Sequence, residues 1–139
     1  MYLLDTNVVS ELRSTRNRKP DGHVAAWAKG VSATSLYLSA ISILEIEMGI
    51  LQKDRSDTKQ AAVLRAWLED HVLRAFSGRI LFVEVAVAKR CAALHVPGPC
   101  SYRDSLIAAT ALVYGLTLVT RNASHFHRTG VSIINPWQP

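Results

Sequence analysis

The sequence predicts an α/β fold of three layers, in which helices cover both faces of a mostly parallel central sheet. Two features predict this fold. Short apolar runs alternate with helical patterns along the chain, and Asp5, Glu45 and Asp104 stand where apolar runs and helices meet. In an open α/β sheet the strand ends meet at one edge, where ligands bind. We therefore expect these three acids, which are far apart in the sequence, to lie close together in space.

The expected strands are short and apolar. They cover residues 2–4, 36–39, 80–83, 116–119 and 131–134. Helical segments separate them along most of the chain, and such connections are typically right-handed crossovers between parallel strands. The pattern therefore favours parallel pairing.

The expected helices fill the intervals between these strands. They cover residues 7–12, a segment that follows Asp21, residues 42–52, 58–76 and 85–95, and a last segment from about Asp104 to Gly115. The segment 58–76 has the clearest period, because its apolar residues recur every three or four positions. Asp21 has the chemistry of a helix N-cap, and Gly78 and Gly115 are expected to end helices.

Each acid also has a purely structural explanation. Asp5 could cap the helix that follows it. Ser42 and Glu45 have the spacing of a capping box, in which the glutamate reaches back to the serine amide, and Asp104 stands in a similar relation to Ser101. Taken together at one sheet edge, the three carboxylates instead predict a site of hard oxygen ligands, suited to Mg²⁺ or Mn²⁺.

The composition predicts a single globular domain over residues 1–139. Hydrophobic residues make up 49% of the chain and charged residues 19%, which is unlike a disordered protein. Lysine and arginine exceed the acids by 16 to 11, giving a net charge of +5. This excess is compatible with an ordinary basic surface, and it also favours a polyanionic partner such as nucleic acid.

Targeting and cross-linking signals are weak. Asp5 interrupts the first hydrophobic residues, which argues against a signal peptide, and the apolar stretch 106–119 is shorter than the roughly 20 residues that a membrane span needs. Two cysteines, Cys91 and Cys100, are too few for a disulfide scaffold. We expect a cytoplasmic protein without a membrane partner.

Several segments, in order along nearly the whole chain, carry a family resemblance. They are residues 3–12, residues 38–42 with Glu45, residues 104–111, residues 118–122 with Phe126, and the ending 135–137. These segments resemble the motifs of PIN-domain proteins of the VapC toxin type, and they are most similar to the FitB-like branch.

The resemblance implies a metal-dependent endoribonuclease that acts as the toxin of a type II toxin–antitoxin system. It implies Asp5, Glu45 and Asp104 as catalytic acids that hold Mg²⁺ or Mn²⁺, with Thr120 as a hydroxyl near the site. It also implies a homodimer and a cognate antitoxin protein that docks over the active site.

The chain departs from the family pattern at one position. Many relatives have a fourth acid just after the final strand, whereas no Asp or Glu follows Asp104 in this sequence. Asn122 occupies one version of the fourth position and could donate an amide oxygen. The sequence therefore leaves open whether a second metal ion binds.

Basic residues are expected to hold the RNA backbone around the acidic centre. Arg13 and Arg16 lie in a basic loop after the first helix, and Arg121 and His125 follow the fourth strand, with His127 and Arg128 close by. The hydroxyl of Thr6 is a further candidate to position substrate. Contacts to phosphates carry no base information, so the RNA is not identified, although the resemblance suggests tRNA as one possibility.

Three other interpretations compete with the nuclease. A catalytically inactive PIN-like module would bind RNA or a partner without cutting. A phospho-receiver domain would need an acidic pair near the first strand, where this chain has only Asp5. A zinc site at Cys91, His95 and Cys100 has poor ligand spacing.

Overall fold

The computed structural model of the protein describes residues 1–138. In chain order its larger elements are β1 (Tyr2–Leu4), α1 (Thr6–Leu12), α2 (Gly22–Lys29), β2 (Leu36–Ser39), α3 (Ala40–Asp54), α4 (Thr58–Ala66), α5 (Leu73–Ala75), β3 (Ile80–Leu81), α6 (Val85–Leu94), α7 (Tyr102–Tyr114), β4 (Thr117–Val119) and β5 (Ile133–Ile134). Short 3-10 helices stand at Ala33–Ser35, Ala123–His125 and His127–Thr129 (η1, η3 and η4), and a π-helix at Trp67–Val72 (η2) joins α4 to α5.

The strands form one sheet in the order β3-β2-β1-β4-β5, and each neighbouring pair is parallel. Strand β1 therefore lies at the centre, between β2 and β4. The register pairs Leu4 with Val119, so β1 and β4 end side by side. Whatever follows these two strands is brought to the same point of the sheet edge.

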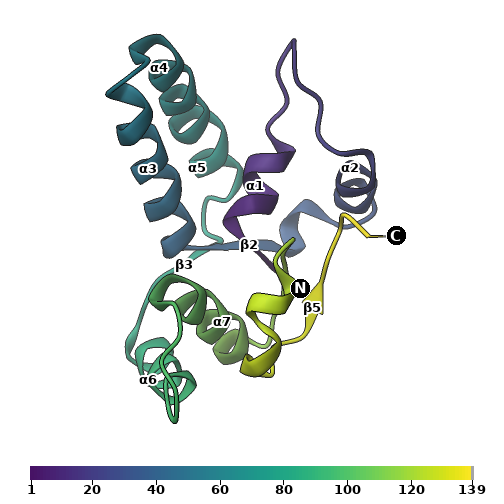
Figure 1. The fold of residues 1–139 in the computed structure, drawn as a ribbon. Coiled ribbons are helices and arrows are strands. Elements are labelled where there is room, and N and C mark those ends of the chain that lie inside the picture. The colour runs from purple at the N-terminus through teal and green to yellow at the C-terminus, as the bar shows by residue number, and fades with distance from the viewer. Residues whose placement is uncertain (139) are drawn as a thin grey trace.

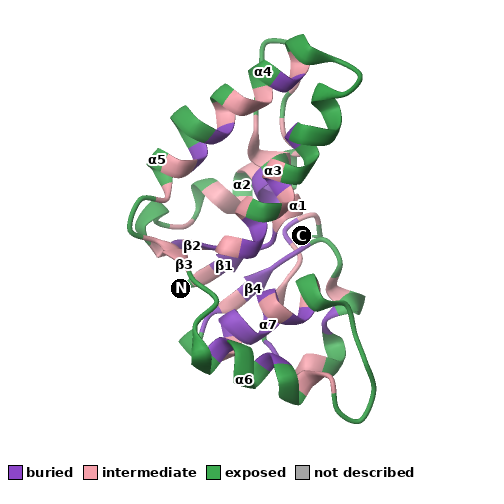
Figure 2. Cartoon of the chain, turned by 90° about the vertical axis from the view of Figure 1, so that its left-hand side faces the viewer, coloured by how far each residue is buried: buried purple, intermediate pink, exposed green. Residues whose placement is uncertain are grey.

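Helices cover both faces of the sheet (Figure 1). Helices α1, α3 and α4 lie on one face, and α6 and α7 lie on the other. Two buried clusters correspond to these faces: one joins Leu4 and Val8 to α3, and the other joins Leu3 to α7. Figure 2 shows the buried residues concentrated in and next to the sheet, with the exposed residues on the outer sides of the helices. The predicted three-layer architecture is confirmed.

The predicted strands agree with the structure in number and order, and differ in length. The strand expected at 80–83 ends at Leu81, because Phe82 and Val83 are exposed rather than buried. The last two strands begin later than predicted, at Thr117 and Ile133. These predicted strands were too long because the apolar runs continue beyond the residues that pair.

The helix expected at 58–76 is interrupted. It starts at Thr58 behind the N-cap Asp57, but residues Trp67–Val72 adopt π-helical hydrogen bonding before α5 begins. Gly78 follows with a φ of 78°, a left-handed conformation that glycine adopts without strain. The other predicted caps, Asp21 and Gly115, are both present.

The start of α3 corrects a prediction that bears on the site. Ser39, rather than Ser42, caps this helix, and its hydroxyl oxygen accepts a hydrogen bond from the amide of Ile41 at 3.0 Å. Helix α3 therefore begins at Ala40, and Ser42 lies inside its first turn. The capping box between Ser42 and Glu45 is not formed, so the capping explanation for Glu45 is wrong.

Across residues 1–138, no helix is long and apolar enough to cross a membrane.

Candidate active site

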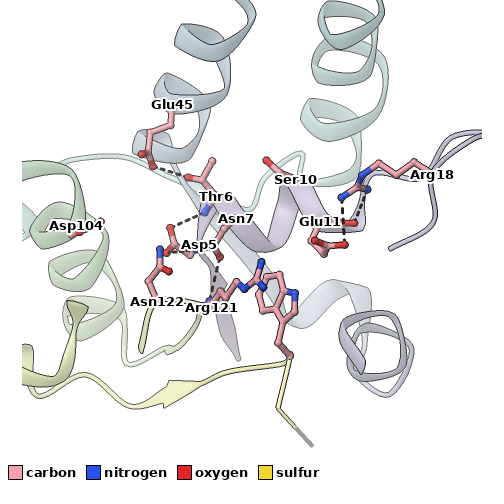
Figure 3. Close-up of a pocket in the computed structure, with 11 residues that line it drawn as sticks. Asp5, Thr6, Asn7, Ser10, Glu11, Arg18, Glu45, Asp104, Arg121 and Asn122 are labelled. Atoms are coloured by element: carbon pink, nitrogen blue, oxygen red, sulfur yellow. Dashed lines mark hydrogen bonds and ion pairs between the residues drawn. The ribbon is translucent and has the colours of Figure 1, made fainter. Parts of the chain in front are cut away.

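A polar pocket of about 510 Å³ lies where β1 and β4 end (Figure 3). Eleven residues line it: Asp5, Thr6, Asn7, Ser10, Glu11, Arg18, Glu45, Asp104, Arg121, Asn122 and Trp137. The structure thus brings Asp5, Glu45 and Asp104 to one pocket although they come from three regions of the chain. The amide of Asp5 donates to the carbonyl of Val119 at 2.9 Å, which ties the first acid to the end of β4.

Asp5 is the most enclosed of the three acids, with 6% of its surface exposed. Its Oδ1 accepts from the amide of Thr6 at 2.8 Å, and its Oδ2 accepts from the hydroxyl of Thr120 at 2.8 Å. Burial raises the pKa of Asp5, and the charges of Glu45 and Asp104 raise it further, while the two hydrogen bonds oppose the rise. The carboxylate is therefore kept in a place that disfavours its negative charge.

Glu45 lies on the first turns of α3 and faces Thr6 instead of its own helix end. The hydroxyl of Thr6 lies 2.7 Å from Oε1 of Glu45, to which it can donate (Figure 3). It also lies 2.9 Å from the hydroxyl of Ser42. The other carboxylate oxygen forms an ion pair with Arg103 at 3.6 Å. Ser42 therefore helps to position Thr6, which in turn positions Glu45.

Asp104 lies in the first turn of α7, and the hydroxyl oxygen of Ser101 accepts from its amide at 3.4 Å. Ser101 is thus the N-cap of α7, and the carboxylate of Asp104 contacts another segment of the chain. Its Oδ2 lies 3.6 Å from Nδ1 of His125, a residue of the segment that follows β4. This contact joins the third acid to the segment after β4.

Thr120 and Asn122 support Asp5 from the end of β4. The Thr120 side chain is fully buried, and its oxygen also accepts from the amide of Asn122 at 3.0 Å. Asn122 itself lines the pocket, at the place where a fourth acid was expected. Asn7 completes this wall, because its Oδ1 accepts from the amide of Arg121 at 3.4 Å.

The donor set suits a small divalent cation, since carboxylate, amide and hydroxyl oxygens surround one pocket. Burial and repulsion by the neighbouring acids raise the pKa of Asp5. A bound cation would offset both effects, because it stabilises the negative charge of the carboxylate. Across residues 1–138, however, no three His, Cys, Asp or Glu side chains are close enough to form a ready-made metal cluster. Glu45 and Asp104 are each held by their own basic partner, so the acids face one pocket without converging on one point.

The basic residues predicted to surround the acids do not all reach the pocket. Arg121 does, and its guanidinium stacks over Trp137 at 5.1 Å from the ring centre. Arg13 instead lies over Trp67, at 5.9 Å, beside a separate apolar pocket. Arg16 is exposed at the tip of a tight turn closed by an antiparallel bridge between Thr15 and Arg18.

Sequence reasoning did not single out Glu11 and Arg18, which line the pocket. Arg18 folds back to an ion pair with Glu11 at 3.3 Å, and it also donates to the carbonyls of Glu11 and Arg13. The amide of Asp21 donates to the same Glu11 carboxylate at 2.9 Å. The Glu11 carboxylate thus holds the basic loop at Arg18 and at Asp21. Only the folded structure shows that Arg18 is the arginine of this loop that lines the acidic pocket.

Comparison with known proteins decides the family. The model of the PIN domain matches residues 2–131, which includes all three acids and the ends of β1 and β4. The chain belongs to the PIN-domain family. The sequence resemblance and the predicted fold class are therefore both confirmed.

Among PIN-domain relatives, the VapC ribonuclease Y4jK of Sinorhizobium fredii is 36% identical over 144 residues, covering 100% of this chain and 99% of its own. Toxin FitB of Neisseria gonorrhoeae is 36% identical over 143 residues, covering 99% of each chain. The crystal structure of FitAcB from Neisseria gonorrhoeae superposes with a TM-score of 0.88 at 35% identity, and the match covers 100% of both chains. The resemblance to the VapC and FitB branch thus holds over the full length of the described PIN fold.

Proposed function

We propose that this PIN-domain protein is the toxin of a type II toxin–antitoxin system and acts as a metal-dependent endoribonuclease in the cytoplasm. The observation that carries the proposal is the assembly of Asp5, Glu45 and Asp104 around one polar pocket at the end of the central strands. Two full-length relatives named as a VapC ribonuclease and as a toxin support it.

Asp5, Glu45 and Asp104 would hold Mg²⁺ or Mn²⁺, with Asn122 as a further oxygen donor. When bound, such an ion acidifies a water molecule and stabilises negative charge on the phosphate. The chain's own residues prepare the site for this. Thr120 and the Thr6 amide hold Asp5 in one orientation, and the Thr6 hydroxyl holds Glu45, so that two carboxylates are fixed before substrate arrives.

Basic side chains at the rim would hold the RNA backbone on either side of the reacting phosphate. Arg121 and Arg18 line the pocket, and Arg103 and His125 contact Glu45 and Asp104. Because phosphate contacts release counterions, binding should weaken steeply as salt increases. Arg13 and Arg16 stay predicted backbone contacts, and they would act on RNA that extends beyond the pocket.

The test is cleavage of purified total tRNA and of a generic single-stranded RNA, each with Mg²⁺, Mn²⁺ or EDTA. We expect cuts only with a metal ion, and we expect Asp5→Asn to abolish them. Asp70→Asn is the matched control, because Asp70 is an exposed aspartate on η2, away from the pocket. It should cleave at the wild-type rate.

Failure of the wild-type protein to cut either RNA with any metal would reject the nuclease. Retained RNA binding in that case would favour the inactive PIN-like module, with Asn122 in place of the fourth acid as the physical reason. Cuts that persist in Asp5→Asn would instead point to a contaminating enzyme or to a different site.

An antitoxin and a second copy of the chain are the proposed protein partners. An apolar pocket of about 270 Å³ lies between α1 and the α4–α5 region, where Trp67 and Phe76 help to line it. A peptide lying along α1 could fill this pocket and place a basic side chain among the carboxylates, where it would substitute for the metal ion. Leu44, Met48 and Leu51 form an exposed apolar stripe on α3 that suits a homodimer contact.

A further inference from the structure

A third hollow, of about 580 Å³, lies beside the acidic pocket. One wall is the segment between α6 and α7, and the other wall is formed by the two 3-10 turns η3 (Ala123–His125) and η4 (His127–Thr129). Its volume falls in the range of roughly 300–1,000 Å³ that is typical of ligand pockets. Of the residues that line this hollow, only His125 takes part in the site described above.

The two walls differ in chemistry. Val96, Pro97 and Pro99 give one wall an apolar surface, while His125, His127 and Arg128 give the other a basic one. Among the described residues that line the hollow there is no Asp or Glu, in contrast to the neighbouring pocket. A ligand that fits would therefore carry negative charge on one side and a flat apolar face on the other.

The basic wall is held in place by the core. Phe126 is fully buried, so the flanking His125 and His127 are anchored on either side of a fixed point. The carbonyl of Phe126 accepts from the hydroxyl of Thr129 at 2.6 Å, and Nδ1 of His127 lies 2.6 Å from the carbonyl of Ser124. Rotation of the His127 ring is thereby restricted, and its other nitrogen remains available to a ligand.

The hollow and the acidic pocket adjoin each other through one contact. His125 lines the hollow, and its Nδ1 lies 3.6 Å from Oδ2 of Asp104, which lines the acidic pocket. A polymer that places one phosphate among the acids can therefore continue into the hollow without leaving the surface. Single-stranded nucleic acid has the required chemistry, since each nucleotide carries a phosphate and a base with a flat face that can pack against aromatic or apolar side chains.

We propose that this hollow is a subsite for a nucleotide that flanks the scissile phosphate, with Arg128 and His127 on its phosphate and the proline wall against its base. The inference rests on the proposed ribonuclease function. It adds a second RNA contact that the acids do not provide, and it favours single-stranded over paired substrate, because a paired base cannot turn into the hollow.

The test measures binding of a fluorescein-labelled single-stranded 12-nucleotide RNA in EDTA, by fluorescence anisotropy over a range of salt concentrations. Arg128→Gln should weaken binding about fivefold to tenfold and should reduce the salt slope by about one, as expected for loss of one phosphate contact. Val96→Glu, which places a negative charge on the apolar wall, should weaken binding by a similar factor.

Matched controls separate a local effect from a general one. Arg55→Gln removes the charge of another exposed arginine, at the end of α3 and far from α6 and α7 (Figure 1), and Val85→Glu adds a carboxylate at a valine that is 75% exposed, against 76% for Val96. Both should bind RNA within about twofold of wild type, since electrostatic effects at exposed sites decay over about a Debye length. Unchanged binding by Arg128→Gln, or an equal loss in the two controls, would overturn the proposal.

Cleavage of the same RNA separates this inference from the function on which it rests. Metal-dependent cleavage with no response to Arg128→Gln would leave the nuclease intact and remove the subsite. Binding that depends on Arg128 without any cleavage would keep the subsite and reject the nuclease. If the hollow variants lose the antitoxin while they bind RNA normally, the occupant is a protein and the proposal is wrong.

Discussion

Replacing Thr120 by valine removes one buried hydroxyl and leaves a side chain of nearly the same shape. That hydroxyl donates to Oδ2 of Asp5 at 2.8 Å and accepts from the amide of Asn122 at 3.0 Å. Because Thr120 has no exposed surface, water cannot take its place. The substitution therefore tests how much the hydroxyl contributes to holding the Asp5 carboxylate in place.

The expected cost follows from the type of hydrogen bond that is lost. A bond to a charged group contributes about 1.5–3 kcal/mol to stability, and leaving a buried partner unsatisfied adds to the loss. We expect Thr120→Val to lower the free energy of unfolding by about 2–3 kcal/mol in EDTA. Cleavage should fall by about 10–100-fold, the usual effect of removing a residue that orients a metal ligand.

The assay is urea denaturation in EDTA, followed by RNA cleavage as a function of Mg²⁺ concentration. Thr110→Val is the matched control, because Thr110 is also fully buried and its hydroxyl donates only to the carbonyl of Leu106 within α7. This control should change stability by less than about 1 kcal/mol, the size of a neutral hydrogen bond. Its cleavage rate should match that of the wild-type protein.

A double-mutant cycle identifies the partner. Adding Thr120→Val to Asp5→Asn should cost less than it does in the wild-type protein, with a coupling of about 1 kcal/mol, because the acceptor is then neutral. Wild-type stability and cleavage in Thr120→Val would refute the reasoning. Equal losses in both Asp5 backgrounds would show that the hydroxyl acts through Asn122 or through packing alone.

Two further predictions concern the acid and the helix that meet at Thr6. Burial, followed by the charges of Glu45 and Asp104, raises the pKa of Asp5, so the folded protein binds this proton more tightly than the unfolded chain and is stabilised by it at low pH. Asp5→Asn should therefore unfold at higher urea than wild type in EDTA at neutral pH. The gain should shrink as the pH falls through the folded-state pKa of Asp5, whereas a loss of stability at neutral pH would favour the capping role. Ser39→Ala removes the hydroxyl that caps α3 and should lower stability by about 0.5–2 kcal/mol in the same urea assay. Ser32→Ala, at an N-cap position without a side-chain cap bond, should change it far less, and equal effects would contradict the assignment of Ser39.

The sequence predicted the sheet well because its strands are short apolar runs next to clear turn and cap residues. It placed the N-cap of α3 three residues late, at Ser42 instead of Ser39, since both serines are plausible caps and only the end of β2 distinguishes them. This error made Glu45 look like a capping residue. In the structure its carboxylate is free to meet Thr6 from another element.

The acids of the site were predictable because parallel strands must end at one edge, whereas the basic rim was not. Arg13, Arg16 and Arg18 belong to one loop, and their spacing does not show which of them faces the pocket. The turn at Thr15 and the ion pair to Glu11 turn Arg18 inward and leave Arg16 outside. The hollow beside His125 was also beyond prediction, since its two walls come from segments that are separate in sequence.

The central place of β1 has a consequence for how the molecule is made. This strand is made before the other strands of the sheet, yet one of its two neighbours, β4 (Thr117–Val119), is made only after β2 and β3. Until then β1 has an unpaired edge, and Asp5 lacks both the Val119 carbonyl and the Thr120 hydroxyl that fix it. The acidic pocket can therefore form only after β4 has been made. Before β4 pairs with β1, the growing chain has no assembled pocket. A protein that covers this pocket can therefore bind only after the two strands have paired.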